Sequence, residues 1–435
     1  MPRRNLLILA LVALVAVLCR ERVQTNPYVR VLAGAMTTIE NRALDPVGER
    51  KLFEGAMDGM IGQLDDYSKY LSPARLKNFL EVVDLEYAGV GIEPGIDPKT
   101  KDLKVLSPLV NSPAARAGIL AGDTILRIGK VSTRGMSLND ASVLLRGKEG
   151  TPVMVTILHK GEDKPQEITI VRENIKGDSV RGNTRNADGS WEFFLGGHNR
   201  IGYLRITTFT ENTVNELRQA LAWMTQQGMR GLVLDLRDNP GGYLDAGVGV
   251  CDLLIESGVI VTTRGRKSRT THYATGKAPF TDVPVAVVVN DQTASAAEIV
   301  AACLQDHRRA AIVGVRTFGK GTVQELIELE PGCGLMKLTT KSYWRPSDKN
   351  IQRPRNASAK DDWGVSPDKG CEIALSDDES ERWREWRSRR DVHQVPDRVS
   401  AADGNKPFVD RQRLRAVEYV EKEAAKRESP RPATP

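Results

Sequence analysis

The sequence predicts a multidomain protein with a layered α/β core. From about residue 175 to residue 374, apolar runs of strand length alternate with segments of helical periodicity, which is typical of helices packed on a sheet. The chain has 435 residues, more than one typical core needs, so two or three domains are expected. The net charge of +6 is modest for this length and no nucleic-acid-binding signature occurs, so no nucleic-acid partner is expected. The expected helices are 215–226, 245–256 and 296–307, and the expected strands are 232–236, 285–289 and 310–313.

A serine stands where one of these strands turns into a helix. The apolar run Pro284 to Val289 breaks at Asn290 and Asp291, and the segment after Ser295 has the pattern of a buried helix. A hydroxyl at this place lies close to the free N–H groups of the first helical turn, which can stabilise a developing oxyanion. The residues Ser295 to Glu298 also match a capping box, so an ordinary helix cap is the competing interpretation.

A single lysine, Lys320, lies between two glycines after the strand 310–313. Glycines in such a turn allow close backbone approach and a rigidly aimed side chain. Phosphate binding is an alternative, but the Walker spacing G-x-x-x-x-G-K-[ST] is absent. A lysine that acts as a base must be neutral, and because its ordinary pKa is about 10.4, the site must bury it away from carboxylates. The local sequence offers Phe318 and Val323 for burial, with no acid before Glu325.

These turns resemble those of the carboxyl-terminal processing proteases, PDZ-containing serine peptidases with a Ser/Lys dyad. Residues 293–298 (TASAAE) are similar to the family's nucleophile turn, and residues 317–324 (TFGKGTVQ) are similar to its base turn. The resemblance implies an endopeptidase in which Ser295 is the nucleophile and Lys320 the general base, with an acyl-enzyme intermediate. It implies that Gln324 orients the lysine, although an ordinary strand glutamine would look the same.

A third segment, Asp235 to Gly242, resembles the family's D-L-R-x-N-P-G-G turn. The resemblance implies that a glycine amide of this turn joins the amide of Ala296 in an oxyanion hole, with Gly241 and Gly242 as the alternatives. It further implies a core similar to the crotonase-like fold, and neither a metal nor a cofactor. The likeness covers about residues 40 to 375 and a short C-terminal piece.

A separate binding module is expected before the core. Gly89, Val90, Gly91 and Ile92 resemble the carboxylate-binding loop of PDZ domains, whose backbone amides hold a peptide C-terminus beside a sheet edge. Residues 112–130 resemble the helical turn and following strand of a PDZ core. An inserted PDZ domain implies that protein substrates are selected by free C-terminal tails with apolar or small residues.

Other chemistries have weaker support. The five histidines are scattered without an H-E-x-x-H pattern, so a zinc protease is not expected. His307, at the end of the helix that follows the serine, is predicted to cap that helix rather than to complete a triad. Cys251 and Cys303 fall in apolar helical patterns and are predicted to be core residues. Two other functions stay open: a PDZ protein that binds tails without cutting them, and an acyl-CoA enzyme with a crotonase-like core.

The N-terminus predicts export. Arg3 and Arg4 precede an apolar run from Leu6 to Cys19, as in a signal sequence. The run is short for a stable membrane helix and no cleavage site follows it promptly, so an uncleaved or weak anchor is expected to hold the protein in the periplasm, on a bacterial inner membrane.

Two helices are expected near the C-terminus. Residues 381–390 are expected to form an amphipathic helix whose tryptophans pack on the core or a partner, and residues 409–422 to form another helix. The family resemblance implies a homodimer built through terminal helices.

These patterns divide the chain into five parts, two of which are helical segments at its ends. The expected parts are a signal or anchor segment (1–25), an N-terminal helical segment (26–86), a PDZ domain (87–173), an α/β core (174–378), and a basic linker with a C-terminal helix and a disordered tail (379–435).

Overall fold

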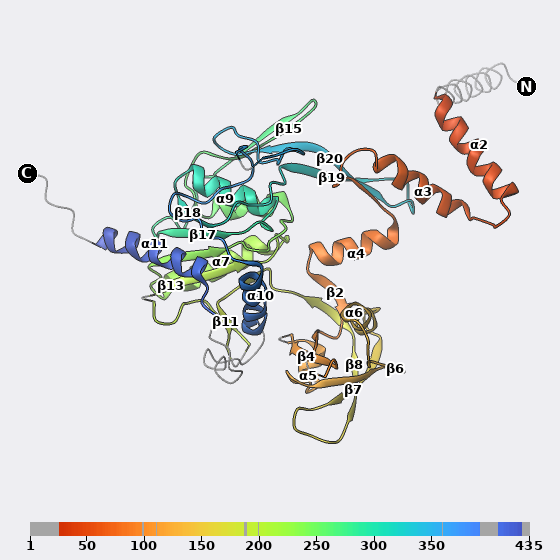
Figure 1. The fold of residues 1–435 in the computed structure, drawn as a ribbon, viewed down its shortest axis with the longest axis horizontal. Helices are drawn as coiled ribbons and strands as arrows, with labels where there is room; N and C mark the ends of the chain where they lie inside the picture. Colours follow the sequence, from red (N-terminus) through yellow and green to blue (C-terminus); the bar gives the residue numbers. More distant parts are fainter. Residues whose placement is uncertain are drawn as a thin grey trace, which may run out of the picture. The chain divides into compact units, whose positions relative to one another are not determined.

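The computed structural model describes residues 26–97, 100–109, 111–186, 189–198, 200–358, 360–391 and 408–428 (Figure 1). The predicted signal or anchor segment, 1–25, and the end of the predicted disordered tail lie outside these residues. The chain divides into two compact units, and each is described by itself. One unit is Met1–Leu76 with Gln324–Thr339, and the other is Lys77–Val323 with Thr340–Pro435. Within the described ranges, no helix combines the length and the apolar character needed to span a bilayer.

The first unit packs a helix against short strands. Its elements are α2 (Pro27–Arg42), α3 (Glu49–Ile61), β1 (Lys69–Leu71), the start of α4 (Pro73–Val83), and parts of β19 (Thr322–Glu328) and β20 (Leu335–Trp344). β1 pairs antiparallel with the start of β20, where Tyr70 lies opposite Met336. Met57 and Ile61 of α3 are buried against Tyr70, so α3 covers this small sheet through one apolar face. This confirms that the N-terminal segment is largely helical.

A five-stranded, mostly parallel sheet forms the centre of the second unit. Its strand order is β10-β13-β14-β17-β18, and the last four strands are parallel. The strands are β10 (Val180–Arg181), β13 (Ile201–Ile206), β14 (Gly231–Asp235), β17 (Val285–Val289) and β18 (Ala310–Gly314). The connections between the parallel strands contain α7 (Thr213–Gln226), α8 (Leu244–Asp252) and α9 (Ala296–Asp306). The predicted α/β core is therefore confirmed, with element ends that differ by a few residues.

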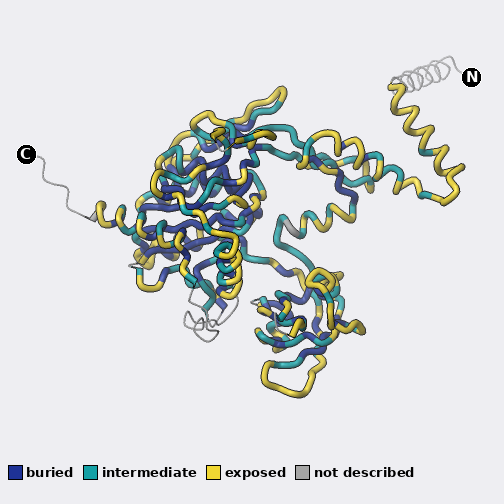
Figure 2. The backbone as a smooth tube through the Cα atoms, in the orientation of Figure 1, coloured by how far each residue is buried: buried dark blue, intermediate teal, exposed yellow. Residues whose placement is uncertain are grey.

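Side chains of the central strands alternate between two apolar layers. Leu232 and Leu234 belong to the large cluster that includes α7, α8 and α9, whereas Val233 belongs to a second cluster with Ala416 and Val417 of α11 (Arg411–Glu428). The sheet is thus covered by helices on both faces, and Figure 2 shows the buried backbone concentrated there. Burial on both faces explains why these strands are continuous apolar runs.

Further strands and a helix surround this sheet. They are β11 (Thr184–Arg185), β12 (Trp191–Glu192), β15 (Val259–Gly265), β16 (Arg269–Tyr273) and α10 (Asp377–Asp391). β15 and β16 form a hairpin, and β15 also pairs with residues 341–344 of β20. Trp383 of α10 is only 3% exposed, so at least one of the predicted helix's tryptophans packs on the protein itself.

The PDZ module is an antiparallel sheet with two helices. Its elements are β3 (Ile92–Ile96), β4 (Leu103–Pro108), α5 (Pro113–Arg116), β5 (Thr124–Ile128), β6 (Val131–Ser132), α6 (Leu138–Leu145), β7 (Pro152–Leu158) and β8 (Gln166–Val171). A separate pair of strands, β2 (Glu86–Gly89) and β9 (Glu173–Lys176), lies at its two ends in the sequence. β3 is an edge strand and contacts α6, which is the arrangement that a peptide added to the sheet requires.

Candidate active site

Three turns meet at the carboxyl ends of neighbouring parallel strands. They follow β14, β17 and β18, and they contain the three segments that the sequence singled out. The N–H of Ala294 donates to the carbonyl of Asn239 (2.9 Å), and the N–H of Phe318 donates to the carbonyl of Thr293 (3.0 Å). The structure therefore brings these turns into direct contact, at the edge of an open α/β sheet where ligands commonly bind.

Ser295 has an unusual backbone conformation at the start of α9. Its φ is 57° and its ψ is −119°, which is strained for a residue other than glycine. An ordinary cap residue has extended backbone angles, so helix capping alone does not account for this conformation. Among the described residues, the N–H of Ala296 has no hydrogen-bond acceptor. The serine is thus held in a sharp turn beside a free amide.

The carboxylate of the fully buried Glu298 holds the serine turn and the lysine turn together. Its Oε2 accepts the N–H groups of Ser295 (2.9 Å) and Lys320 (2.8 Å). Its Oε1 accepts the Thr317 hydroxyl (2.6 Å) and the N–H of Gly319 (2.7 Å). Burial raises the pKa of Glu298 to about 7, and the four donors oppose the rise. Two turns that are 25 residues apart therefore share one carboxylate.

The surroundings of the lysine turn differ from what its local sequence suggests. Phe318 is 40% exposed, so it does not supply the burial expected of it. Trp363 packs on the turn instead, because a Cβ added to Gly319 would lie 2.6 Å from the Trp363 ring. The local sequence contains no acid near Lys320, but the fold brings Glu298 to its backbone N–H. Neither Trp363 nor the pairing with Glu298 could be found from neighbours in the sequence.

The turn after β14 presents one free glycine amide. The N–H of Gly241 donates to Oδ1 of Asn239 (2.8 Å), so that amide is already bonded. Among the described residues, the N–H of Gly242 has no acceptor. Gly241 has a φ of +98°, and an added Cβ would lie 2.7 Å from the Cβ of Ser295. Only glycine allows this turn to approach the serine so closely.

Tyr343 is a residue of the site that sequence analysis missed. Its side chain lies close enough to that of Ser295 to interact with it, and burial raises the pKa of Tyr343 to about 12. Its N–H also donates to the carbonyl of Gly321 (2.7 Å), directly after Lys320. No motif marks this tyrosine in the sequence, because its position depends on how β20 pairs in the fold.

Gln324 lies in the first unit, whereas Ser295 and Lys320 lie in the second. Its Nε2 donates to the hydroxyl of Thr339 (3.2 Å), which donates in turn to the carboxylate of Asp65 (3.0 Å). The side chain is therefore fixed by a short hydrogen-bonded chain. Its role in orienting the lysine stays a prediction.

The PDZ loop presents backbone rather than side chains. Val90 and Ile92 are 1% and 5% exposed and belong to the module's apolar core. Gly91 has a φ of +75°, and an added Cβ would lie 2.3 Å from the Cβ of Ser112. In the described part of the chain, the N–H groups of Val90 and Gly91 have no acceptor. The loop, which begins at Gly89, can thus offer free amides to a carboxylate.

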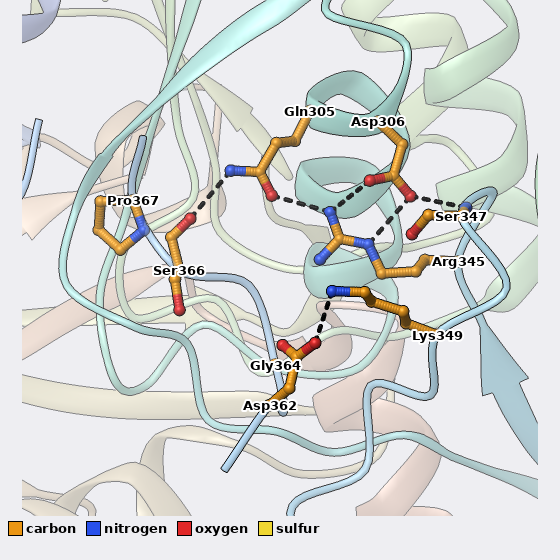
Figure 3. Close-up of a pocket in the computed structure, with 9 residues that line it drawn as sticks. All are labelled: Gln305, Asp306, Arg345, Ser347, Lys349, Asp362, Gly364, Ser366 and Pro367. Carbon is orange, nitrogen blue, oxygen red and sulfur yellow. Dashed lines mark hydrogen bonds and ion pairs between the residues drawn. The ribbon is translucent and has the colours of Figure 1, made fainter. Parts of the chain in front are cut away.

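A pocket of about 330 Å³ lies at the other end of α9 (Figure 3). Arg345 pairs there with Asp306 (2.6 Å), and Lys349 pairs with Asp362 (2.6 Å). α9 separates Asp306 from Ser295 by about 16 Å at the usual rise per residue. Because its charges are already paired, this pocket is a structural cluster and not an extension of the site.

The competing residues have ordinary surroundings. Cys251 and Cys303 are buried free thiols in α8 and α9, as predicted. His307 is the C-cap of α9, as predicted, and its backbone N–H donates to the carbonyl of Cys303 (3.1 Å). Its Nε2 contacts the carbonyl of Val259 (2.8 Å), outside the helix. In the ranges that the structure describes, no group of three or more His, Cys, Asp and Glu residues is placed to hold a metal ion.

Comparisons with known proteins agree with this architecture. Residues 200–369 match the model of peptidase family S41, and residues 104–158 match a PDZ domain model. A carboxy-terminal-processing protease of Bartonella bacilliformis is 41% identical over 310 residues, which are 70% of this chain and 68% of that protein. A carboxyl-terminal-processing protease of Synechocystis is 34% identical over 76% of this chain and 73% of that protein. A solved photosystem II D1 C-terminal processing protease is 28% identical, with a TM-score of 0.45, over 82% of this chain and 94% of that one.

The chain belongs to the carboxyl-terminal processing protease family, whose members are serine peptidases with an S41 peptidase domain and a PDZ domain. The family resemblance inferred from the turns around Ser295 and Lys320 is therefore confirmed.

Proposed function

We propose that this chain is an endopeptidase that captures protein C-terminal tails in its PDZ groove and cleaves the chain through an acyl-enzyme on Ser295. Lys320 is the general base, and Gln324 orients its amine. The amides of Ala296 and Gly242 form the oxyanion hole, because the amide of Gly241 is already bonded to Asn239.

The observation that carries this proposal is the shared carboxylate of Glu298. It accepts the backbone N–H groups of both Ser295 and Lys320 on one oxygen, so the nucleophile turn and the base turn are held as a unit. The strained backbone of Ser295 supports the same role, since such strain is concentrated at functional sites. A capping box accounts for the bond from the Ser295 N–H to Glu298, but not for the strained backbone of Ser295 or for the bonds that Glu298 accepts from the lysine turn.

In the proposed reaction, the neutral amine of Lys320 takes the proton of the Ser295 hydroxyl as the serine oxygen bonds to the scissile carbonyl carbon. The carbonyl oxygen becomes an oxyanion that accepts the two free amides. The C–N bond then breaks, and the lysine ammonium gives its proton to the departing amine. Lys320 next removes a proton from water, whose oxygen attacks the ester. The serine regains its proton and the new carboxyl end leaves.

Tail capture is tested with one peptide in three forms. We expect a peptide with a free apolar C-terminus to be cleaved with a kcat/KM about tenfold to a hundredfold higher than its amidated form or a form ending in aspartate. The reason is that a free carboxylate gains charge-assisted hydrogen bonds of roughly 1.5 to 3 kcal/mol from the amides of the Gly89–Ile92 loop, and an acidic last side chain does not fit an apolar groove. The measurement is kcat/KM on the full chain.

The tail experiment has a matched pair of glycine variants. Gly91→Ala places a Cβ against Ser112 in the loop, whereas Gly150→Ala adds one in open space at a similar φ of +78°. We expect only Gly91→Ala to abolish the difference between the free and amidated peptides. Equal kcat/KM values for all three peptides with the unaltered enzyme would remove the recognition role and leave the PDZ domain as a regulatory element.

We further propose that the protein is exported, that residues 1–25 hold it on the periplasmic face of the inner membrane, and that it forms a homodimer. The basic residues and apolar run of that segment support the location. We expect the full chain to sediment with inner-membrane vesicles and to be digested by protease added to spheroplasts. Deleting residues 2–25 should leave it in the cytoplasm, and unchanged membrane association after that deletion would contradict the anchor.

A further inference from the structure

We infer that the C-terminal segment of the chain, by which we mean α10 and residues 410–412, holds the oxyanion turn in its catalytic shape. The oxyanion turn is residues 235–242, and it is contacted from this segment by four side chains. The inference rests on the proposed function, because it concerns the amide of Gly242. It gives the C-terminal segment a part in catalysis although it lies about 90 to 115 residues beyond the serine in the sequence.

The main tether is the guanidinium of Arg237. Nη1 donates to Oδ1 of Asp410 (3.0 Å) and to Oε1 of Gln412 (3.1 Å). Nη2 donates to Oδ2 of Asp410 (2.8 Å) and to Oδ2 of Asp235 (2.6 Å), and Nε donates to Asp235 (3.0 Å). All five N–H donors are therefore used, in a side chain that is only 1% exposed. Two of the three partners belong to the C-terminal segment.

Two residues of α10 complete the contact. The ring of Trp383 lies 4.3 Å from the guanidinium of Arg237 and covers one of its faces. Nε of Arg384 donates to Oδ2 of Asp238 (3.0 Å), and Oδ1 of Asp238 accepts from Asn290 (2.7 Å). Asp238 is thus held between α10 and the strand end that leads to the serine.

The turn needs such support because its backbone is strained. Asp238 has a φ of 55°, in the left-handed region that residues with a side chain rarely adopt, and such residues persist only where their surroundings fix them. The tethered residues immediately precede Asn239, whose carboxamide binds the N–H of Gly241 and so sets the next amide. A displacement of about 1 Å at a catalytic group can reduce a rate about a hundredfold.

The tether is separable from the attachment of α11 to the core. α11 is anchored on the sheet by Ala416, Val417 and Val420, which are all buried. Asp410→Asn keeps the volume of the side chain and an oxygen that can accept from the N–H of Arg413. Arg411→Ala is the matched control, because Arg411 donates to Glu379 of α10 (2.9 Å) and not to the turn.

The experiment compares a peptide ester with the corresponding thionoester, in which sulfur replaces the carbonyl oxygen. An oxyanion hole shaped for oxygen discriminates against the larger sulfur, which accepts hydrogen bonds weakly. We expect Asp410→Asn and Gln412→Leu to lower kcat for the ester about tenfold to a hundredfold at nearly constant KM. We also expect both variants to lower the ratio of kcat for the ester to kcat for the thionoester. Arg411→Ala should keep both the rate and the ratio.

The ratio is independent of how many enzyme molecules are folded, so it separates positioning from stability. A fall in kcat with an unchanged ratio in Asp410→Asn would show that only the folded fraction had changed, and would overturn the inference. Unchanged kcat in both variants would overturn it as well. Ser295→Ala is measured in parallel: if it still hydrolyses the ester, the proposed function fails, and this inference with it.

Discussion

Ser295→Ala and Lys320→Ala should each lower proteolysis of an unfolded protein about 10⁴-fold or more, because each removes one part of the proposed proton-transfer unit. The two losses should not add in the double variant, since removing either residue already disables the unit. Both variants should fold, because Ser295 and Lys320 donate to the Glu298 carboxylate through their backbone N–H groups, which neither substitution removes. The measurement is the rate of casein digestion together with thermal unfolding.

The pocket of Figure 3 provides a matched serine and lysine as a control. Ser347→Ala and Lys349→Ala change the same residue types at the far end of α9, and both should digest casein at nearly the normal rate. Wild-type activity in purified Lys320→Ala would contradict the dyad.

The rate of the unaltered enzyme should rise on the alkaline side as the lysine loses its proton. A flat profile of rate against pH between about pH 6 and pH 9, with chemistry limiting, would contradict a titrating base.

The architecture of the core could be read from the sequence because its signals are local. The strand 285–289 was predicted with the ends that the structure has, since five consecutive apolar residues between polar turns leave little ambiguity. The helix predicted at 245–256 ends earlier, at Asp252, because apolar residues continue beyond the helix into a buried turn. Helix ends depend on caps and tertiary contacts, which periodicity does not report.

The candidate site was only partly visible in the sequence, for a physical reason. Ser295 and Lys320 stand in distinctive turns, so their patterns made them candidates from the sequence alone. Glu298 was visible only as one half of a capping box, because its contacts with the lysine turn depend on the neighbouring strands β17 and β18 being parallel. Tyr343 and Asp410 reach the site from β20 and from the C-terminal segment, and no local pattern records contacts made at such distances along the chain.

Glu298→Gln should lower kcat/KM about a hundredfold, because an amide cannot accept the four hydrogen bonds that the carboxylate accepts. One of the two positions now held by an oxygen would carry an NH₂ group that faces two N–H or O–H donors. Each buried donor left without an acceptor costs about 1 to 3 kcal/mol, so the serine and lysine turns should separate or shift. Glu328→Gln, an exposed acid-to-amide change in β19, is the control and should keep normal activity. The measurement is kcat/KM at pH 8 with thermal unfolding of both variants.

The pH dependence of the same residue gives a test in which stability and activity move in opposite directions. Burial raises the pKa of Glu298 from 4.5 to about 7, so the native state holds this proton more tightly than the unfolded chain does. The stability that this provides is fully present below pH 4.5 and is lost as the pH rises through 7. Activity should instead rise across the upper part of that window, because only the ionised carboxylate accepts all four donors.

We expect urea unfolding of the unaltered enzyme to show a fall in stability from pH 5 to pH 8 that Glu298→Gln lacks. The variant's residual activity should keep only the alkaline rise that belongs to the lysine. If Glu298→Gln retained normal kcat/KM and the full pH profile, the carboxylate would have no part in holding the two turns, and the dyad would need another support.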